Sequence, residues 1–171
     1  MADFEIDTGW SVFDIYLDSM GDEIEYSIHF GNEDTLLEIR VSDYSEIQDI
    51  SLIYVDRIYQ KDTSLPRTEG MKTFFQAQGP DWNNQGTRMP LWINLHPRTR
   101  ELELIFAPAC DTDIRADLCY TEGRIELFLK EYELVEPLDG LLRPAWDPVC
   151  IRVTDLTDEE YEYLRQFVLL P

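Results

Sequence analysis

The sequence predicts a mainly β protein with a small α component: antiparallel strands in a two-layer sandwich or partly open barrel, with one C-terminal helix. Three observations support this prediction. Apolar and polar residues alternate with a period of two along most of the chain. Turns that contain glycine or proline separate the alternating runs, and only the last stretch has clear helical spacing. At 171 residues the chain has the length of a single domain, 1–171, with enough sequence to bury a core.

The first alternating runs lie in the N-terminal third. Residues 12–18 and 23–30 both alternate, and the short segment between them contains a glycine. Two such runs joined by a short turn predict an antiparallel hairpin with one face in water. A second turn at 31–34 leads to residues 37–42, which alternate as well. The sequence therefore predicts a three-stranded meander.

Two stretches fit both the strand period and the helix period. In residues 46–60, several apolar side chains follow a helical stripe, but Ile, Val and Tyr dominate, and these residues favour strands. A strand is therefore favoured there. Residues 124–135 begin with the alternation of a strand but also contain apolar residues at helical spacing, so strand and helix both remain open.

The second half of the chain begins with a loop-rich segment and returns to alternation at residue 91. Residues 60–90 are rich in Gly and Pro and contain one expected short strand, 72–78. Alternation then predicts strands at 91–95, 102–106, 114–120, 125–135 and 149–153. The helix is expected to begin at the capping box Thr157–Glu160 and to pack Tyr161, Leu164, Phe167 and Val168 on a sheet.

The charge of the chain is strongly negative, with a formal net charge of −21 and a pI of about 4.2. The aromatic content of 12% is too high for a disordered acidic tail. Binding to nucleic acid or to an anionic membrane depends on Lys and Arg, which are scarce here, so we expect neither partner. Residues 1–56 hold fifteen carboxylates and one arginine. This imbalance favours a basic protein partner.

The leading functional hypothesis is therefore a non-enzymatic acidic binding or inhibitor protein. It would cover the basic, nucleic-acid-binding or nuclease surface of a partner, as immunity proteins of nuclease toxins and phage inhibitors that imitate nucleic acid do. Strand alternation places the candidate binding residues on one solvated surface. They are Asp14, Tyr16, Asp18, Glu23, Glu25 and Glu38. The simpler alternative is that these side chains are only solvated.

A second hypothesis is a β-sandwich module that binds a small ligand such as a carbohydrate. Its candidate residues lie in the loop-rich region 79–100, where planar amides, arginines and an aromatic ring come together in sequence. They are Trp82, Asn84, Arg88 and His96. In the simpler alternative, the arginines of this region neutralise acidic residues of the first third and Trp82 belongs to the core.

Sequence motifs of the common catalytic and cofactor sites are missing. The chain has no GxSxG, GxGxxG or GxxxxGK[ST] pattern. Residues 111–122 resemble the spacing of a calcium loop, but Arg115 and Ala116 occupy positions that need an oxygen ligand and a glycine. We therefore expect no catalytic residues, no metal and no cofactor. Three cysteines without CxxC spacing, no signal peptide and no membrane-length apolar run predict a cytoplasmic protein.

Overall fold

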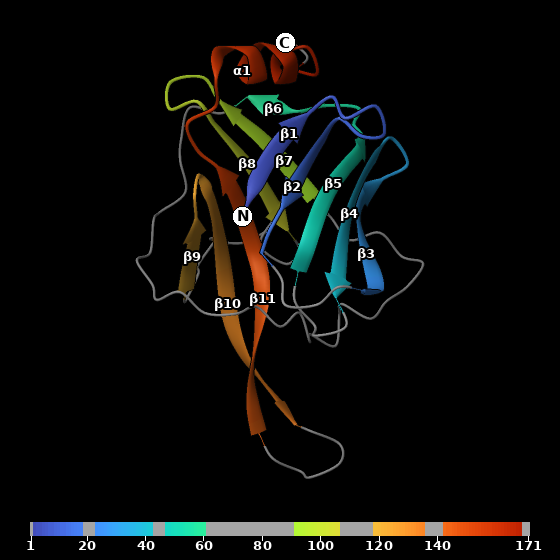
Figure 1. Cartoon of the computed structure of the whole chain (residues 1–171), viewed down its shortest axis with the longest axis vertical. Helices are drawn as coiled ribbons and strands as arrows, with labels where there is room; N and C mark the ends of the chain where they lie inside the picture. Colours follow the sequence, from blue (N-terminus) through green and yellow to red (C-terminus); the bar gives the residue numbers. More distant parts are fainter. Residues whose placement is uncertain are drawn as a thin grey trace.

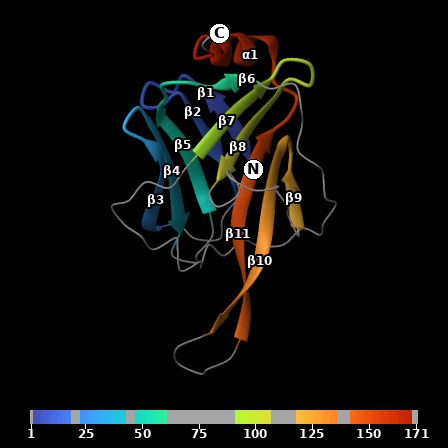
Figure 2. The same cartoon turned by 180° about the vertical axis from the view of Figure 1, so that it is seen from behind.

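Two β-sheets pack face to face, with a helix at one end, in the computed structural model of the chain (Figures 1 and 2). The structure describes residues 2–18, 23–42, 47–60, 91–106, 118–135 and 142–168. The predicted fold class, mainly β with one C-terminal helix, is confirmed. No helix in these residues is long and apolar enough to cross a membrane.

The first sheet has five antiparallel strands from the N-terminal third. In spatial order they are β1 (Asp3–Ile6), β2 (Phe13–Tyr16), β5 (Ile47–Tyr54), β4 (Thr35–Ser42) and β3 (Ile24–Asn32). The strand assignment of residues 46–60 is thus confirmed over Ile47–Tyr54.

The predicted hairpin between residues 12–18 and 23–30 is wrong. Strand β2 pairs with β1 and β5, whereas β3 pairs with β4, so the order β2-β5-β4-β3 is a Greek key. Loop length explains the difference. The β3–β4 turn leaves only Glu33 and Asp34 unpaired, the length of a tight hairpin, but seven residues separate β2 from β3. The sequence alternation correctly predicted that Phe13, Ile15, Ile28 and Phe30 face the core, but Ile24, which was also expected to face inward, is 46% exposed. The alternation carried no information on the neighbouring strand.

The second sheet has six strands, all antiparallel except for a short parallel pair at one edge. In spatial order they are β6 (Tyr59–Gln60), β7 (Leu91–His96), β8 (Glu101–Phe106), β11 (Leu142–Val153), β10 (Ile125–Val135) and β9 (Leu118–Glu122). Residues 125–135 are therefore a strand. The expected strand at 72–78 and the first part of 114–120 lie outside the described residues. Strands β10 and β11 extend beyond the two sheets as a two-stranded ribbon (Figure 1).

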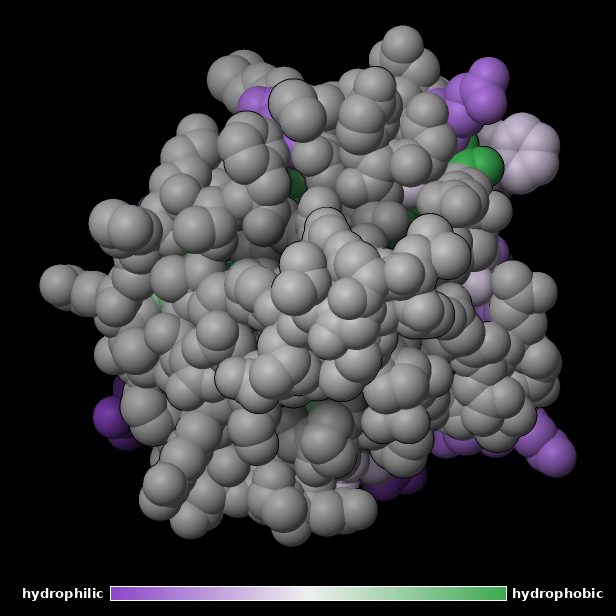
Figure 3. Space-filling model, turned by 90° about the horizontal axis from the view of Figure 1, so that it is seen from below, coloured by the Kyte–Doolittle hydropathy of each residue, from purple (hydrophilic) through white to green (hydrophobic). Residues whose placement is uncertain are grey.

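One apolar core fills the space between the sheets and reaches the helix. Phe30 of the first sheet and Phe106 of the second meet with ring centroids 4.8 Å apart. Helix α1 (Asp158–Arg165) begins with the predicted capping box and buries Tyr161 and Leu164 against the core. Where described residues reach the surface at the lower end of the molecule, most of them are hydrophilic (Figure 3).

Candidate functional site

The outer face of the five-stranded sheet gathers carboxylates from four of its strands. We call this surface the acidic face and define it by two neighbouring cross-strand rows, which alternate with core rows such as Ile15–Ile50–Ile39. The rows are Asp3–Tyr16–Asp49–Arg40–Ser27 and Glu5–Asp14–Ser51–Glu38–His29. They hold five carboxylates and a single arginine.

The centre of the acidic face is less open than the sequence suggested. Asp14 was expected on a solvated surface, but it is only 7% exposed. Its carboxylate accepts hydrogen bonds from the Ser11 hydroxyl at 2.8 Å and from the Tyr16 hydroxyl at 3.4 Å. Burial of the phenol and the charge of Asp14 raise the pKa of Tyr16. Asp14 thus holds the side chains of Ser11 and Tyr16 in place by hydrogen bonding. Tyr16 itself is 36% exposed.

The single arginine of the acidic face is shared between two carboxylates. The Nε of Arg40 lies 2.5 Å from Asp49 and 3.8 Å from Glu38. Burial lowers the pKa of Arg40, but the hydrogen bond and charge of Asp49 more than offset this and raise it. Burial also raises the pKa of Asp49 above its ordinary value, despite the arginine beside it. Glu38 contacts His29 at 3.3 Å as well.

The other predicted binding residues do not belong to the two rows. Asp18 and Glu23 are exposed, in the segments that follow β2 and precede β3. The backbone N–H of Asp18 donates to the Glu122 carboxylate of the second sheet at 3.4 Å. The backbone of Glu25 belongs to β3, and its side chain lies outside the described part of the chain.

Three acidic residues of the face were missed in the sequence. Asp3 and Glu5 belong to β1, whose alternation covers only four residues and is a weak signal. Asp49 lies in the stretch 46–60, where strand and helix spacing overlap, so the direction of its side chain was not predicted. The pairing of β2 with both β1 and β5 places all three beside Asp14 and Tyr16.

An exposed tryptophan lies in a turn that a hydrogen bond connects to the acidic face. Trp10 is 90% exposed and occupies the turn between β1 and β2. The turn is ordered by a backbone hydrogen bond from Asp7 to Val12 at 2.9 Å and by a contact between the hydroxyls of Thr8 and Ser11 at 2.8 Å. Ser11 in turn donates to Asp14, so the turn and the acidic face are linked.

The residues of the predicted carbohydrate site do not come together in the described structure. Trp82, Asn84 and Arg88 lie outside the described residues. His96 was expected on an outer strand face in contact with ligand, but it is only 2% exposed. Its Nε2 is bound to the Glu103 carboxylate, so the ring is not available to a ligand.

The outer face of the six-stranded sheet carries a buried ionic cluster around Arg152. The guanidinium is fully buried and lies 3.2 Å from Glu103, 3.6 Å from Glu101 and 3.9 Å from Glu126. It also lies over the ring of Phe128, at 4.8 Å from the centroid. These residues, with His96, form the cluster that we call the Arg152 cluster.

An apolar row flanks the Arg152 cluster and contains both described cysteines as free thiols. Cys150 and Cys119 are buried beside Phe128. Burial, and the charge of Glu103, raise the pKa of the Cys150 thiol well above its ordinary value. The thiolate, which is the nucleophilic form, is therefore disfavoured. Within the described ranges no group of three His, Cys, Asp or Glu side chains could hold a metal ion.

No protein-family model, curated protein or solved structure matches the chain.

Proposed function

We propose that the protein is a non-enzymatic acidic binding protein that uses the acidic face to cover the basic surface of a protein partner. The observation that carries the proposal is the pair of cross-strand rows, which hold five carboxylates and one arginine, and in which that arginine pairs with only Asp49 and Glu38 of the five. Exposed Asp3 and Glu5 and partly exposed Glu38 would form the charged contacts. The type of function is that of an immunity protein or of an inhibitor that imitates nucleic acid.

The arrangement of the carboxylates supports a partner of opposite charge. Neighbouring strands lie about 4.8 Å apart, so the sheet holds the exposed carboxylates of Asp3 and Glu5 and the partly exposed one of Glu38 at fixed positions. Complementary charge speeds association and makes it depend on salt. Hydrogen bonds that order the centre of the face, such as Ser11 to Asp14, reduce the conformational freedom lost on binding.

Trp10 would add apolar contacts to the charged contacts that the acidic face makes with a partner. Tryptophan, tyrosine and arginine are enriched among the residues that dominate binding energy. Trp10 is held in an ordered turn and points into solvent, and Tyr16 lies on the face itself.

The free thiols of Cys119 and Cys150 fit the reducing cytoplasmic location that the cysteine pattern predicts.

The test is affinity capture from the source cell with three forms of the protein, followed by measurement of the captured partner's affinity. One form is wild type, one carries Asp3→Asn, Glu5→Gln and Glu38→Gln, and the matched control carries Glu33→Gln, Asp34→Asn and Glu162→Gln. All six residues lie on the surface, and the control removes the same charge away from the face. Asp14 is left intact because it is buried and hydrogen-bonded.

We expect wild type and control to retain a basic protein at low salt and to release it at high salt. The acidic-face variant should bind it more weakly by roughly tenfold or more, since several interface charges are lost together. Equal affinity of the acidic-face variant and the control would contradict the proposal. Melting temperatures of the three forms check that each remains folded.

A further inference from the structure

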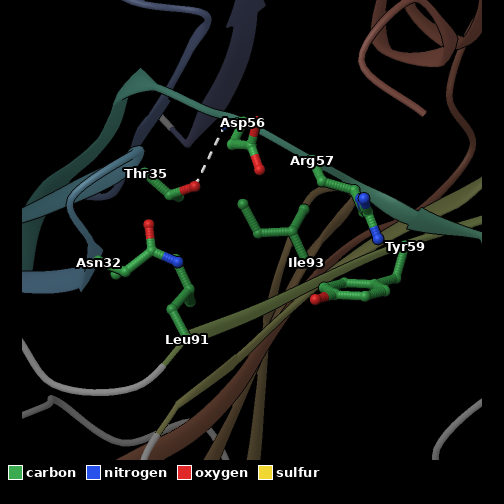
Figure 4. Close-up of a pocket in the computed structure, with 8 residues that line it drawn as sticks. Asn32, Thr35, Asp56, Arg57, Tyr59, Leu91 and Ile93 are labelled. Atoms are coloured by element: carbon green, nitrogen blue, oxygen red, sulfur yellow. Dashed lines mark hydrogen bonds between the residues drawn. The ribbon is translucent and has the colours of Figure 1, made fainter. Parts of the chain in front are cut away.

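A pocket of about 280 Å³ lies where an edge of the five-stranded sheet meets an edge of the six-stranded sheet (Figure 4). Its walls come from the β3–β4 turn, the segment between β5 and β6, and the start of β7. The residues that matter for its chemistry are Asn32, Thr35, Asp56, Arg57, Leu91 and Ile93. It contains none of the residues of the acidic face.

The walls of the pocket are fixed by hydrogen bonds. The backbone N–H of Asp56 donates to the Thr35 hydroxyl at 3.2 Å, which ties the two sides together (Figure 4). The Asn32 carboxamide oxygen accepts from the Asp34 N–H at 2.8 Å and shapes the turn. Further along, the backbone N–H of Ile58 donates to the Phe167 carbonyl at 3.1 Å. The pocket is therefore formed before any ligand arrives.

Glycine is required at position 31 for the pocket to keep its shape. Gly31 has a φ of 120°, and a Cβ there would lie 2.0 Å from the backbone oxygen of Thr35. Any side chain at this position would push the two strands of the β3–β4 hairpin apart and change the adjacent pocket wall.

The pocket holds two opposite charges that are not neutralised within the described residues. Asp56 and Arg57 are both exposed, and neither side chain has an ion-pair partner among those residues. Most other described arginines lie within 4 Å of a carboxylate. They are Arg40, Arg100, Arg124, Arg152 and Arg165. In a chain with 35 acidic residues, a pocket arginine without an ion-pair partner among the described residues is unusual.

We propose that this pocket binds a small zwitterion, an α-amino acid with an apolar side chain. The guanidinium of Arg57 would bind the carboxylate of the ligand, since arginine forms paired hydrogen bonds with that group. The carboxylate of Asp56 would bind the ammonium group. Leu91 and Ile93 supply an apolar wall for the side chain.

The charges and the volume favour this class over others. A simple anion would be repelled by Asp56 and by the overall charge of −21, and a simple cation would be repelled by Arg57. A neutral sugar would leave both charges without a counterion. Ligand pockets usually have volumes of about 300–1,000 Å³, so this pocket is suited to a single small molecule and not to a nucleotide.

The proposal is tested by isothermal titration calorimetry and thermal-shift measurements on the full chain. The probes are L-leucine and L-phenylalanine, their analogues 4-methylpentanoic acid and isoamylamine, which each lack one charge, and glucose as a neutral polyol. We expect at least one amino acid to bind, with roughly tenfold to hundredfold weaker binding of the singly charged analogues, because each loses one charge-assisted hydrogen-bonded contact. Equal binding of an analogue, binding of glucose alone, or no binding of either amino acid at millimolar concentration would overturn the proposal.

Variants then locate the site. Arg57→Gln and Asp56→Asn should each weaken amino-acid binding by roughly tenfold to hundredfold. The matched control Arg165→Gln removes the same charge from an exposed position on α1 and should bind as wild type does. Since both pocket charges are exposed, the melting temperatures of the unliganded variants should stay close to that of wild type. Unchanged binding in Arg57→Gln would show that the ligand lies elsewhere and would overturn the assignment.

Discussion

The outer faces of the two sheets contain similar residues in opposite environments. On the five-stranded sheet, Asp3 and Glu5 are exposed and Arg40 is the single cation among five carboxylates. On the six-stranded sheet, Arg152 is completely buried among three glutamates. Both faces arise from the same alternation of polar and apolar residues.

This difference shows that alternation reports direction but not exposure. A polar residue in an alternating strand points away from the shared core, yet it meets water only if nothing covers that side of the sheet. The carboxylates of the Arg152 cluster are therefore structural, and they contribute little to the charge that a partner would meet. The net charge of −21 overstates what the surface displays.

The strongest test of this contrast is removal of the central cation of the Arg152 cluster. Arg152→Met should lower the free energy of unfolding by about 3–5 kcal/mol, because it removes the buried cation that the carboxylates of Glu101 and Glu103 share. Urea denaturation at neutral pH measures the change.

The control for that experiment is Arg165→Met, which removes an exposed arginine paired with the exposed Glu162. It should change stability by about 0.5 kcal/mol or less. A similarly small effect of Arg152→Met would mean that the cluster is not the structural element inferred from its burial, and the contrast between the two faces would fail.

A smaller effect is expected at Arg124, which connects the two sheets to the helix. Its guanidinium forms two hydrogen bonds of 2.6 Å with Glu160 and one of 3.3 Å with the backbone oxygen of Phe4. Because the pair is partly exposed, Arg124→Gln should cost about 1–2 kcal/mol in urea denaturation. Glu160→Gln should cost a similar amount, and the double variant less than the sum of the two.

The pH dependence of stability gives an independent readout of this pair. Burial would raise the pKa of Glu160, but hydrogen bonds from Arg124 and from Thr157 more than offset it and lower the pKa below the ordinary value of 4.5. The stabilisation is thus fully present above that value and is lost as the pH falls through the lower, folded-state pKa. Wild type should lose stability in this acid range more steeply than Arg124→Gln, and parallel curves would contradict the assignment.

Local patterns predicted much of the fold. The alternation of Phe13 and Ile15, the capping box at Thr157 and the strand residues of 125–135 all identified elements that the structure contains. The neighbour of β2 could not be predicted in this way. It depends on long-range pairing with β5, in which Ile15 lies opposite Ile50. Many other apolar strands could place an apolar residue opposite Ile15 equally well, so the local pattern does not identify the partner strand.

The candidate site was predictable only in part, for the same reason. Tyr16 and Glu38 were expected on the outer face of the sheet and lie there. The burial of Asp14 could not be predicted, because the alternation of the strand does not reveal the packing and the hydrogen bonds with Ser11 and Tyr16 that surround its carboxylate. The pocket at Asp56 and Arg57 could not be predicted either, since it forms where the edges of the two sheets meet, and its walls come from segments that are far apart in the sequence.

The smallest predicted effect concerns Asp49, the buried carboxylate at the centre of the acidic face. Burial raises its pKa above the ordinary value of 3.8, so its contribution to stability is present below that value and is lost as the pH rises through the folded-state pKa. Asp49→Asn should therefore raise the free energy of unfolding at neutral pH by about 0.5–1 kcal/mol, with Asp3→Asn unchanged within about 0.5 kcal/mol. Urea denaturation of both variants at neutral pH provides the comparison. A loss of more than about 1 kcal/mol in Asp49→Asn would show that the Arg40–Asp49 pair is as structural as the Arg152 cluster. The carboxylates at the centre of the acidic face would then be committed to the fold, and only those at its margin would remain for a partner.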